Sequence, residues 1–123
     1  MMIECLPMEF SVCRVRDYSG VDLERPFTFT GRTDRERSLV CPTSDVPSDV
    51  MDREDGWRAL RVSGTLDFSL VGIISRIAGV LSERGIPVFV ISTYDTDYIL
   101  VRASAMDEAV AELSSDGHEI TRL

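Results

Sequence analysis

The feature that most constrains the fold is a change of hydrophobic period within the C-terminal half of the chain. Arg58 to Leu66 alternates apolar and polar residues, which is typical of a strand with one buried face. From Leu70 onward the apolar residues instead fall at helical spacing, at Leu70, Ile73, Ile74, Ile77, Val80 and Leu81. We expect Ser69 to cap this helix and Gly85, followed closely by Pro87, to end it.

The residues after this helix predict two further strands, a helix and a last strand. Val88 to Thr93 is nearly continuous in apolar and β-branched residues, which favours a central, covered strand. Tyr98 to Ala103 predicts its partner, reached through the polar hairpin loop Tyr94 to Asp97. A capping-box pattern at Ser104 to Asp107 predicts the second helix, and His118 to Thr121 predicts the last strand.

The resulting order is strand, helix, strand, strand, helix, strand. Two right-handed crossovers joined by a central hairpin give a ferredoxin-like α+β fold (βαββαβ), with an antiparallel sheet and both helices on one face. The other face of that sheet must be covered or paired. We therefore expect a homodimer.

The N-terminal half is less regular than the C-terminal half. Val21 to Arg25 has room for one helical turn at most, and the acidic segment Pro42 to Gly56 has the composition of a linker. Three stretches predict strands: Glu9 to Val15, Pro26 to Thr30 and Ser38 to Cys41. We interpret residues 1–56 as an abbreviated version of the same unit with its linker, and residues 57–123 as the complete C-terminal domain.

The charge composition excludes several classes of partner and of enzyme. Thirteen basic residues against twenty-one acidic ones leave a net charge of −8, so nucleic acid and anionic membranes are unfavourable partners. Every basic residue is Arg, which excludes a Schiff-base lysine and a P-loop lysine. Because Met1 to Phe10 lacks the basic segment of a secretory signal, we expect a cytoplasmic protein.

The residues that could carry metal or nucleophilic chemistry are few. Cys5, Cys13 and Cys41 are widely spaced, and we interpret them as structural thiols without a disulfide or a metal. His118 is the only histidine, and we expect it to be structural or solvent-facing. The chain has no Asn for acylphosphatase chemistry and no Ser/His/Asp pattern. We therefore expect no catalytic residues, no cofactor and no enzymatic activity.

Three sequence segments carry a resemblance to a known family. The stretch from Gly72-Ile-Ile through Leu81 and Gly85-Ile to Ile91-Ser-Thr-Tyr-Asp-Thr-Asp-Tyr-Ile-Leu-Val101 resembles the signature of bacterial ACT-domain proteins. It is also similar to the animal arginine sensors called CASTOR. Arg37 to Pro42 and Gly56-Trp57-Arg58 match the same pattern. The resemblance implies a tandem ACT fold that binds a free amino acid at a junction between ACT units.

An amino acid is a zwitterion, so its site needs donors for the carboxylate and an acceptor for the ammonium. The turn into the first helix offers backbone N–H groups, and Gly72 allows a ligand to approach the backbone. Asp97, with carbonyl groups near it, can accept the ammonium. The ligand-binding residues that we expect are Val71, Gly72, Ile73, Thr93, Tyr94, Thr96 and Asp97.

Each of these residues also has a purely structural interpretation. Gly72 can be a packing glycine where the helix crosses the sheet. Asp95 and Asp97 are common in turns, so a hairpin without a ligand would use them as well. The alternative function is accordingly a protein–protein interaction module that keeps the ACT fold without a ligand.

Overall fold

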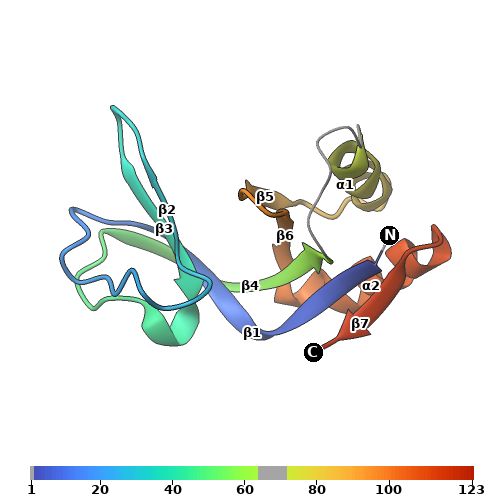
Figure 1. Cartoon of the computed structure of the whole chain (residues 1–123), viewed down its shortest axis with the longest axis horizontal. Coiled ribbons are helices and arrows are strands. Elements are labelled where there is room, and N and C mark those ends of the chain that lie inside the picture. The colour runs from blue at the N-terminus through green and yellow to red at the C-terminus, as the bar shows by residue number, and fades with distance from the viewer. Residues whose placement is uncertain (1, 64–71) are drawn as a thin grey trace. The chain divides into compact units, whose positions relative to one another are not determined.

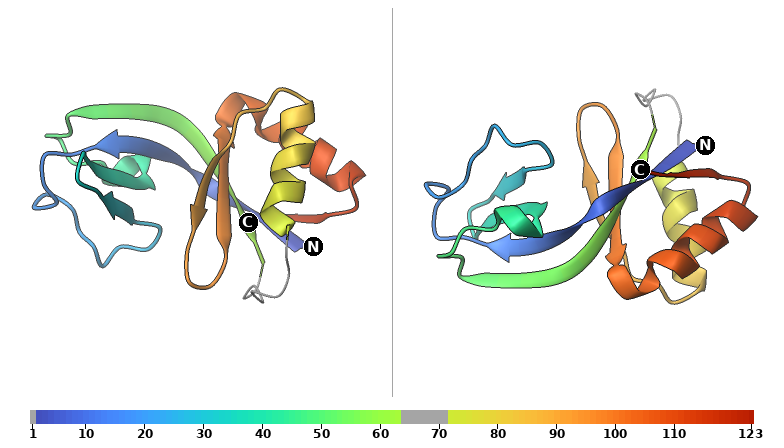
Figure 2. Two further views of the ribbon diagram at one scale, coloured as in Figure 1. Left: turned by 90° about the horizontal axis from the view of Figure 1, so that it is seen from above. Right: turned by 90° about the horizontal axis from the view of Figure 1, so that it is seen from below.

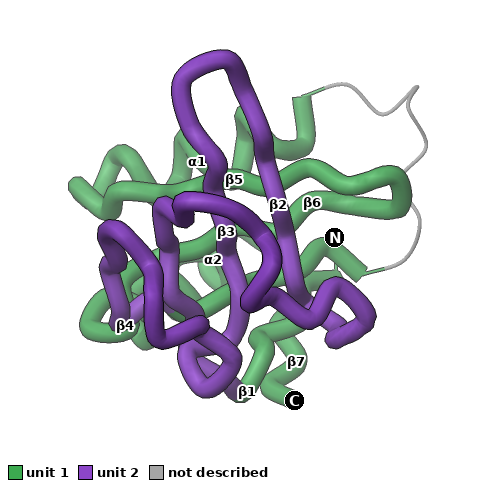
Figure 3. Tube along the Cα trace, turned by 90° about the vertical axis from the view of Figure 1, so that its left-hand side faces the viewer, with its two compact units in different colours: residues 1–7, 58–123 green, residues 8–57 purple. Residues whose placement is uncertain are grey.

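The computed structural model describes residues 2–63 and 72–123 (Figure 1). The chain forms two compact units, Met1–Pro7 with Arg58–Leu123 (unit 1) and Met8–Trp57 (unit 2), coloured separately in Figure 3. Strands β1 (Met2–Arg14) and β4 (Asp52–Val62) contribute residues to both units. The predicted cap Ser69, the predicted helical residue Leu70 and the candidate ligand-binding residue Val71 lie outside the described residues.

Unit 1 has the predicted βαββαβ order, which confirms the α+β, ferredoxin-like class. After β4 come α1 (Ile73–Glu83), β5 (Phe89–Ser92), β6 (Asp97–Arg102), η2 (Ala103–Ala105), α2 (Met106–Ser115) and β7 (Glu119–Arg122). In Figure 2 the two helices lie side by side.

The core of unit 1 lies between the two helices and one face of the sheet. Alternate residues of three strands point into it: Ile3 and Cys5 from β1, Leu60 and Val62 from β4, and Ile99 and Val101 from β6. The helices contribute Ile77, Leu81, Met106, Ala109 and Leu113. The period-two and helical patterns of the sequence thus correspond to the buried face of each element.

The N-terminal strand adds a parallel pair to the antiparallel sheet of unit 1. β1 pairs with β7 in parallel, with Met2 opposite Glu119 and Cys5 opposite Arg122 (Figure 1). It also neighbours β4, since the Ser63 N–H donates to the Met2 carbonyl at 2.8 Å. The expected antiparallel sheet is confirmed, and the pairing of β1 with β7 adds one parallel pair to it. The domain division after residue 56 stays a prediction, although residues 1–7 belong to the compact unit that contains residues 58–123.

The expectation that residues 88–93 form a central, covered strand is also wrong. The strand β5 lies at the end of the described sheet, beyond β6. Its side chains alternate between half-buried and exposed, and Val90 is 38% exposed. An apolar, β-branched run therefore predicted a strand correctly but not its place in the sheet, because residues of this kind also suit a half-buried edge strand.

The predicted end of α1 is confirmed, whereas the predicted start of α2 is wrong. Gly85 has φ +70°, and the Ile86 and Gly85 N–H groups donate to Leu81 and Ser82, which makes a Schellman motif at the end of α1. The capping box at Ser104 is wrong. Ser104 lies within the 3-10 turn η2, and α2 begins after Ala105 without a side-chain cap.

Unit 2 is a small antiparallel sheet with little helix, as expected for an abbreviated half. β3 (Arg37–Pro42) pairs with β1 and with β2 (Phe29–Arg32), and the 3-10 turn η1 (Thr43–Asp45) follows β3. A small core is formed by Cys13, Val15, Leu39 and Cys41.

The interpretation of residues 42–56 as a linker is wrong in part, because β4 already begins at Asp52. The acidic side chains from Asp52 onward, which contributed to the linker interpretation, belong to exposed residues of this strand. Asp52 accepts a hydrogen bond from Arg14 Nε at 2.8 Å, and Asp55 accepts one from Ser11 at 2.5 Å. Their polarity follows from this exposed position on β4.

The core of unit 1 yields a direct stability prediction. Leu81→Ala removes a fully buried side chain, so we expect the free energy of unfolding to fall by about 2–5 kcal/mol. Leu123→Ala, at a position that is 54% exposed, should change it by less than about 0.5 kcal/mol. Urea unfolding followed by circular dichroism measures both, and equal effects would contradict the described core.

Candidate functional site

Gly72 is the residue from which α1 starts. Its φ of +84° is a left-handed conformation that favours glycine, whereas a Cβ built at this position meets nothing within 4 Å. The backbone conformation, and not close packing, therefore accounts for a glycine here. The Arg76 N–H donates to the Gly72 carbonyl at 2.9 Å as an intrahelical bond of the first turn. The N–H groups that precede it point out of the helix end without an intrahelical acceptor.

A cavity of about 140 Å³ lies at this end of α1. Ile73 and Arg76 line it from the helix, and Asp116, Gly117 and His118 line it from the connection between α2 and β7. The cavity thus brings together the start of one helix, a cation and a carboxylate. Of the described residues expected to bind the ligand, only Ile73 lines it. The others are not among its lining residues: Gly72, Thr93, Tyr94, Thr96 and Asp97.

One carboxylate oxygen organises the charged groups of the cavity. Asp116 Oδ2 lies 3.3 Å from Arg76 Nε and 3.2 Å from His118 Nε2. The His118 side chain is only 6% exposed, and its Nδ1 has no hydrogen-bond partner in the described part of the chain. His118 is therefore buried beside the cavity, so the solvent-facing alternative for this residue is wrong. Sequence reasoning missed Arg76 and Asp116, whose only signal was their position at two helix ends.

The hairpin residues Thr93 and Thr96 use their side chains to hold the loop. Thr93 Oγ1 donates to the Thr96 carbonyl at 2.9 Å, and the Thr96 N–H donates back to Thr93 Oγ1 at 3.3 Å. The Thr96 hydroxyl donates to the Val62 carbonyl at 2.8 Å, and the residue is 6% exposed. Both hydroxyl groups thus have structural partners.

The other two hairpin candidates are more accessible. Tyr94 is 87% exposed at the tip of the loop. Asp97 begins β6 opposite Ser92 and is half-buried. Of the four hairpin candidates, Tyr94 and Asp97 are therefore the ones whose side chains can meet a ligand without giving up a hydrogen bond within the hairpin.

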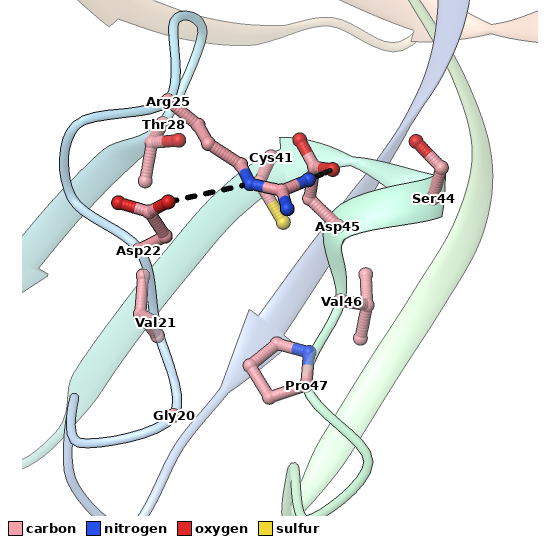
Figure 4. A pocket seen from close by; sticks show the side chains of 10 residues that line it. All are labelled: Gly20, Val21, Asp22, Arg25, Thr28, Cys41, Ser44, Asp45, Val46 and Pro47. Atoms are coloured by element: carbon pink, nitrogen blue, oxygen red, sulfur yellow. Dashed lines mark hydrogen bonds and ion pairs between the residues drawn. The ribbon is translucent and has the colours of Figure 1, made fainter.

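Unit 2 contains a second cavity, of about 260 Å³ (Figure 4). It lies between the loop that carries Asp22 and Arg25 and the turn that carries Asp45. Figure 4 shows the Arg25 guanidinium between the two carboxylates, 2.6 Å from Asp45 and 3.5 Å from Asp22. The cation of this cavity is already paired twice, so the three side chains join the loop to the turn.

Cys41 contributes a thiol to the same cavity (Figure 4). Burial, with a smaller effect from the neighbouring Cys13, raises the pKa of the Cys41 thiol to about 11. Since the thiolate is the nucleophile, a cysteine with this pKa is unreactive at neutral pH. This supports the interpretation of Cys41 as a structural thiol.

Comparison with known families decides where this fold belongs. The model of the ACT domain matches residues 52–115, from the start of β4 to the end of α2 and over more than half of the chain. The chain belongs to the ACT domain family. Its ACT domain therefore carries Gly72, Ile73 and Arg76 at the start of α1 and the whole β5–β6 hairpin.

Solved structures share the fold beyond this ACT domain. Protein Atu0741 from Agobacterium tumefaciens is 28% identical with a TM-score of 0.88, and the match covers 99% of this chain and 92% of that one. VC0802 from Vibrio cholerae, titled a protein of unknown function and possible transport protein, is 21% identical with a TM-score of 0.69, over 93% and 88%. The regulatory subunit of aspartate kinase from Thermus thermophilus is 6% identical with a TM-score of 0.62, over 92% and 95%.

These matches fix the family and the fold but not the ligand. At 21% and 6% identity, the second and third structures show the fold alone. A search among curated proteins found no match. The similarity to CASTOR stays a prediction. In the described part of the chain, no helix is long and apolar enough to cross a membrane, and no group of three or more side chains is arranged to hold a metal ion.

The hairpin contacts lead to a prediction for Thr96. Thr96→Val keeps the shape of the side chain but leaves the Val62 carbonyl without its buried donor, so the free energy of unfolding should fall by about 1–3 kcal/mol. Thr121→Val, on an exposed position of β7, is the matched control and should stay within about 0.5 kcal/mol. Thermal or urea unfolding measures both free energies. An unchanged free energy of unfolding for Thr96→Val would show that the bond between the Thr96 hydroxyl and the Val62 carbonyl does not stabilise the fold.

The pKa of Cys41 leads to a labelling prediction. With a thiol pKa of about 11, roughly one Cys41 in a thousand is a thiolate at pH 8. We expect iodoacetamide at pH 8 to leave native Cys41 unmodified and to alkylate it fully in urea, as measured by peptide mass spectrometry. Rapid alkylation of Cys41 in the native protein would show an exposed or activated thiol.

Proposed function

We propose that this ACT-domain chain is a regulatory module that binds a free amino acid, and not an enzyme. The observation that carries the proposal is the cavity at the start of α1, where Arg76, Asp116 and the end of a helix face one space. Few ligands need a cation, a carboxylate and unpaired amides within so small a volume. An α-amino acid needs all of them.

The ligand carboxylate would lie at the start of α1. The N–H groups near Gly72 and Ile73 and the positive end of the helix dipole stabilise an anion there. Arg76 adds a charged donor whose side chain is 67% exposed, so it can turn toward the ligand. We propose this role for Ile73, which lines the cavity, and for Gly72, which precedes it at the start of α1. The role expected of Val71 lies outside the described residues.

The ligand ammonium has two candidate acceptors. Asp116 lines the cavity and now contacts Arg76 at 3.3 Å, a partly exposed pair of the kind that stabilises a protein little and that a ligand can separate. Asp97, with Tyr94 beside it on the hairpin, is the acceptor expected from the sequence. We propose Asp116 as the main acceptor of the ligand ammonium, because it lines the same cavity as Arg76.

The relatives support a regulatory role. The Thermus thermophilus protein of the same fold is a regulatory subunit of aspartate kinase, and the match covers 95% of it. A module of similar size and fold can therefore serve as a regulatory part of a larger assembly. We propose the same kind of role for this chain, with a homodimer as its assembly.

The second candidate function is a protein–protein interaction module without a ligand. The observation that favours it is the strand β5, which ends the described sheet and exposes Val90, with the exposed Tyr94 in the loop that follows it. An exposed strand edge with apolar side chains is a surface on which another chain can add a strand. The exposed edge of β5 does not exclude a ligand at the start of α1. Only a screen for ligands can therefore distinguish the two functions.

A thermal-shift screen of the twenty amino acids tests the proposed function first. An amino acid at one hundred times its dissociation constant should stabilise the fold by about 2.7 kcal/mol. Calorimetry on the best ligand then compares variants. Arg76→Gln and Asp116→Asn should each weaken binding by about 2–4 kcal/mol, because each leaves a ligand charge without its partner.

Arg84→Gln is the control for charge, since Arg84 pairs with Glu112 at the other end of α1 and should bind the ligand normally. Asp97→Ala and Asp95→Ala test whether the hairpin contributes to affinity for the amino acid. If Asp97→Ala weakens binding and Asp95→Ala does not, Asp97 is the ammonium acceptor. If none of the twenty amino acids binds, the interaction module becomes the better account.

A further inference from the structure

A second charged surface lies in unit 2, where β1 ends and the β2–β3 hairpin turns. A hollow of about 240 Å³ is lined there by four guanidinium side chains, those of Arg14, Arg16, Arg35 and Arg37. Val15 and Met51 supply its apolar lining. This is a dense group of cations in a chain whose net charge is −8.

The backbone holds this group together. The Val15 N–H donates to the Arg37 carbonyl at 2.9 Å, and the Met51 N–H donates to the Arg14 carbonyl at 2.8 Å. Arg35 lies in the turn between β2 and β3. The Arg35 N–H donates a hydrogen bond to the Thr33 hydroxyl at 3.1 Å, which stabilises this turn. The arginines therefore come from two segments, residues 14–16 and 35–37, which the bond between Val15 and Arg37 holds close to each other.

Three of the four guanidinium groups form no side-chain hydrogen bond or ion pair within the described part of the chain. Arg14 pairs with Asp52, and the Glu36 carboxylate, which also lines the hollow, accepts a hydrogen bond from Ser38 at 2.7 Å. Arg16, Arg35 and Arg37 form no side-chain hydrogen bond or ion pair with any described residue.

Asp17 is a further carboxylate that interacts with two of these arginines. Its pKa is lowered, first by hydrogen bonds from the Ser19 hydroxyl and backbone N–H, and to a smaller extent by Arg37 and Arg16. The Asp17 carboxylate thus accepts its hydrogen bonds within its own turn and offsets only part of the positive charge of the arginines. The hollow keeps an excess of positive charge.

The strand register adds to the repulsion. Arg32 of β2 lies directly opposite Arg37 of β3, and like charges opposite each other destabilise a strand pair. The other cavity of unit 2 shows the contrast, because there the single Arg25 contacts two carboxylates (Figure 4). The hollow holds three guanidinium groups that form no ion pair with residues 2–63 or 72–123, and an anion bound between them would offset their repulsion.

We propose that this hollow binds a small molecule that carries a diphosphate or two adjacent phosphate groups. Guanidinium groups bind phosphate oxygens through two parallel hydrogen bonds, which suits them to this ligand better than an ammonium. Three such groups around a space of about 240 Å³ match a compact anion with several charged oxygens. The site belongs to unit 2 and does not depend on amino-acid binding in unit 1.

The test is calorimetry of the full chain with inorganic pyrophosphate at fixed ionic strength. We expect saturable binding to one site per chain. The double variant Arg16→Gln/Arg35→Gln should weaken binding about tenfold for each guanidinium lost. The double variant Arg84→Gln/Arg122→Gln changes the net charge equally, at two positions of unit 1 that pair with Glu112 and Asp107, and should bind pyrophosphate normally.

Both variants must unfold at the same temperature as the parent, which their exposed positions favour. Equal loss in the two double variants would show a general effect of charge and overturn the proposal, as would the absence of saturable binding. Tighter binding of citrate, of a poly-glutamate peptide or of an oligothymidylate than of pyrophosphate would overturn the assignment to a small phosphate compound.

Discussion

The parallel pairing of the first strand with the last is the constraint on which unit 1 depends. Met2 to Cys5 lie against Glu119 to Arg122, so the two ends of the sequence meet inside one sheet. This pairing buries Ile3 and Cys5 beneath α1 and α2, in the same core as Leu60 and Val62. It also fixes the start of β7, and with it the turn that carries Asp116 and His118.

The candidate site follows from that arrangement of backbone. Gly72 starts α1 with φ +84°, and Gly117 ends the α2–β7 turn with φ +92°, both left-handed conformations that suit glycine. Between these two turns Arg76 and Asp116 come within 3.3 Å although forty residues separate them. Two glycine turns beside the core of unit 1 therefore place the charged groups of the cavity, which is the geometry that the proposed function requires.

The sequence predicted the elements better than their pairing. The helical spacing of Ile73, Ile77 and Leu81 identified α1 because burial selects those positions. Parallel pairing of residues 2–5 with residues 119–122 leaves no local pattern in the sequence, so the position of β1 could not be predicted. The edge position of β5 could not be predicted either, because an apolar, β-branched run suits a central strand and a half-buried edge strand alike. Asp52 and Asp55 suggested a linker because an exposed strand face has the same composition. The hairpin candidates were found as a motif, whereas Arg76 and Asp116 meet only through the fold.

The most direct test of the central claim is a set of nuclear magnetic resonance titrations of the isotope-labelled chain with single amino acids. We expect one amino acid to cause saturable shifts that are largest at the amides of Gly72, Ile73, Arg76, Gly117 and His118. Saturable shifts confined to unit 2, or no saturable shift with any of the twenty amino acids, would contradict the assignment of the start of α1 as the ligand site.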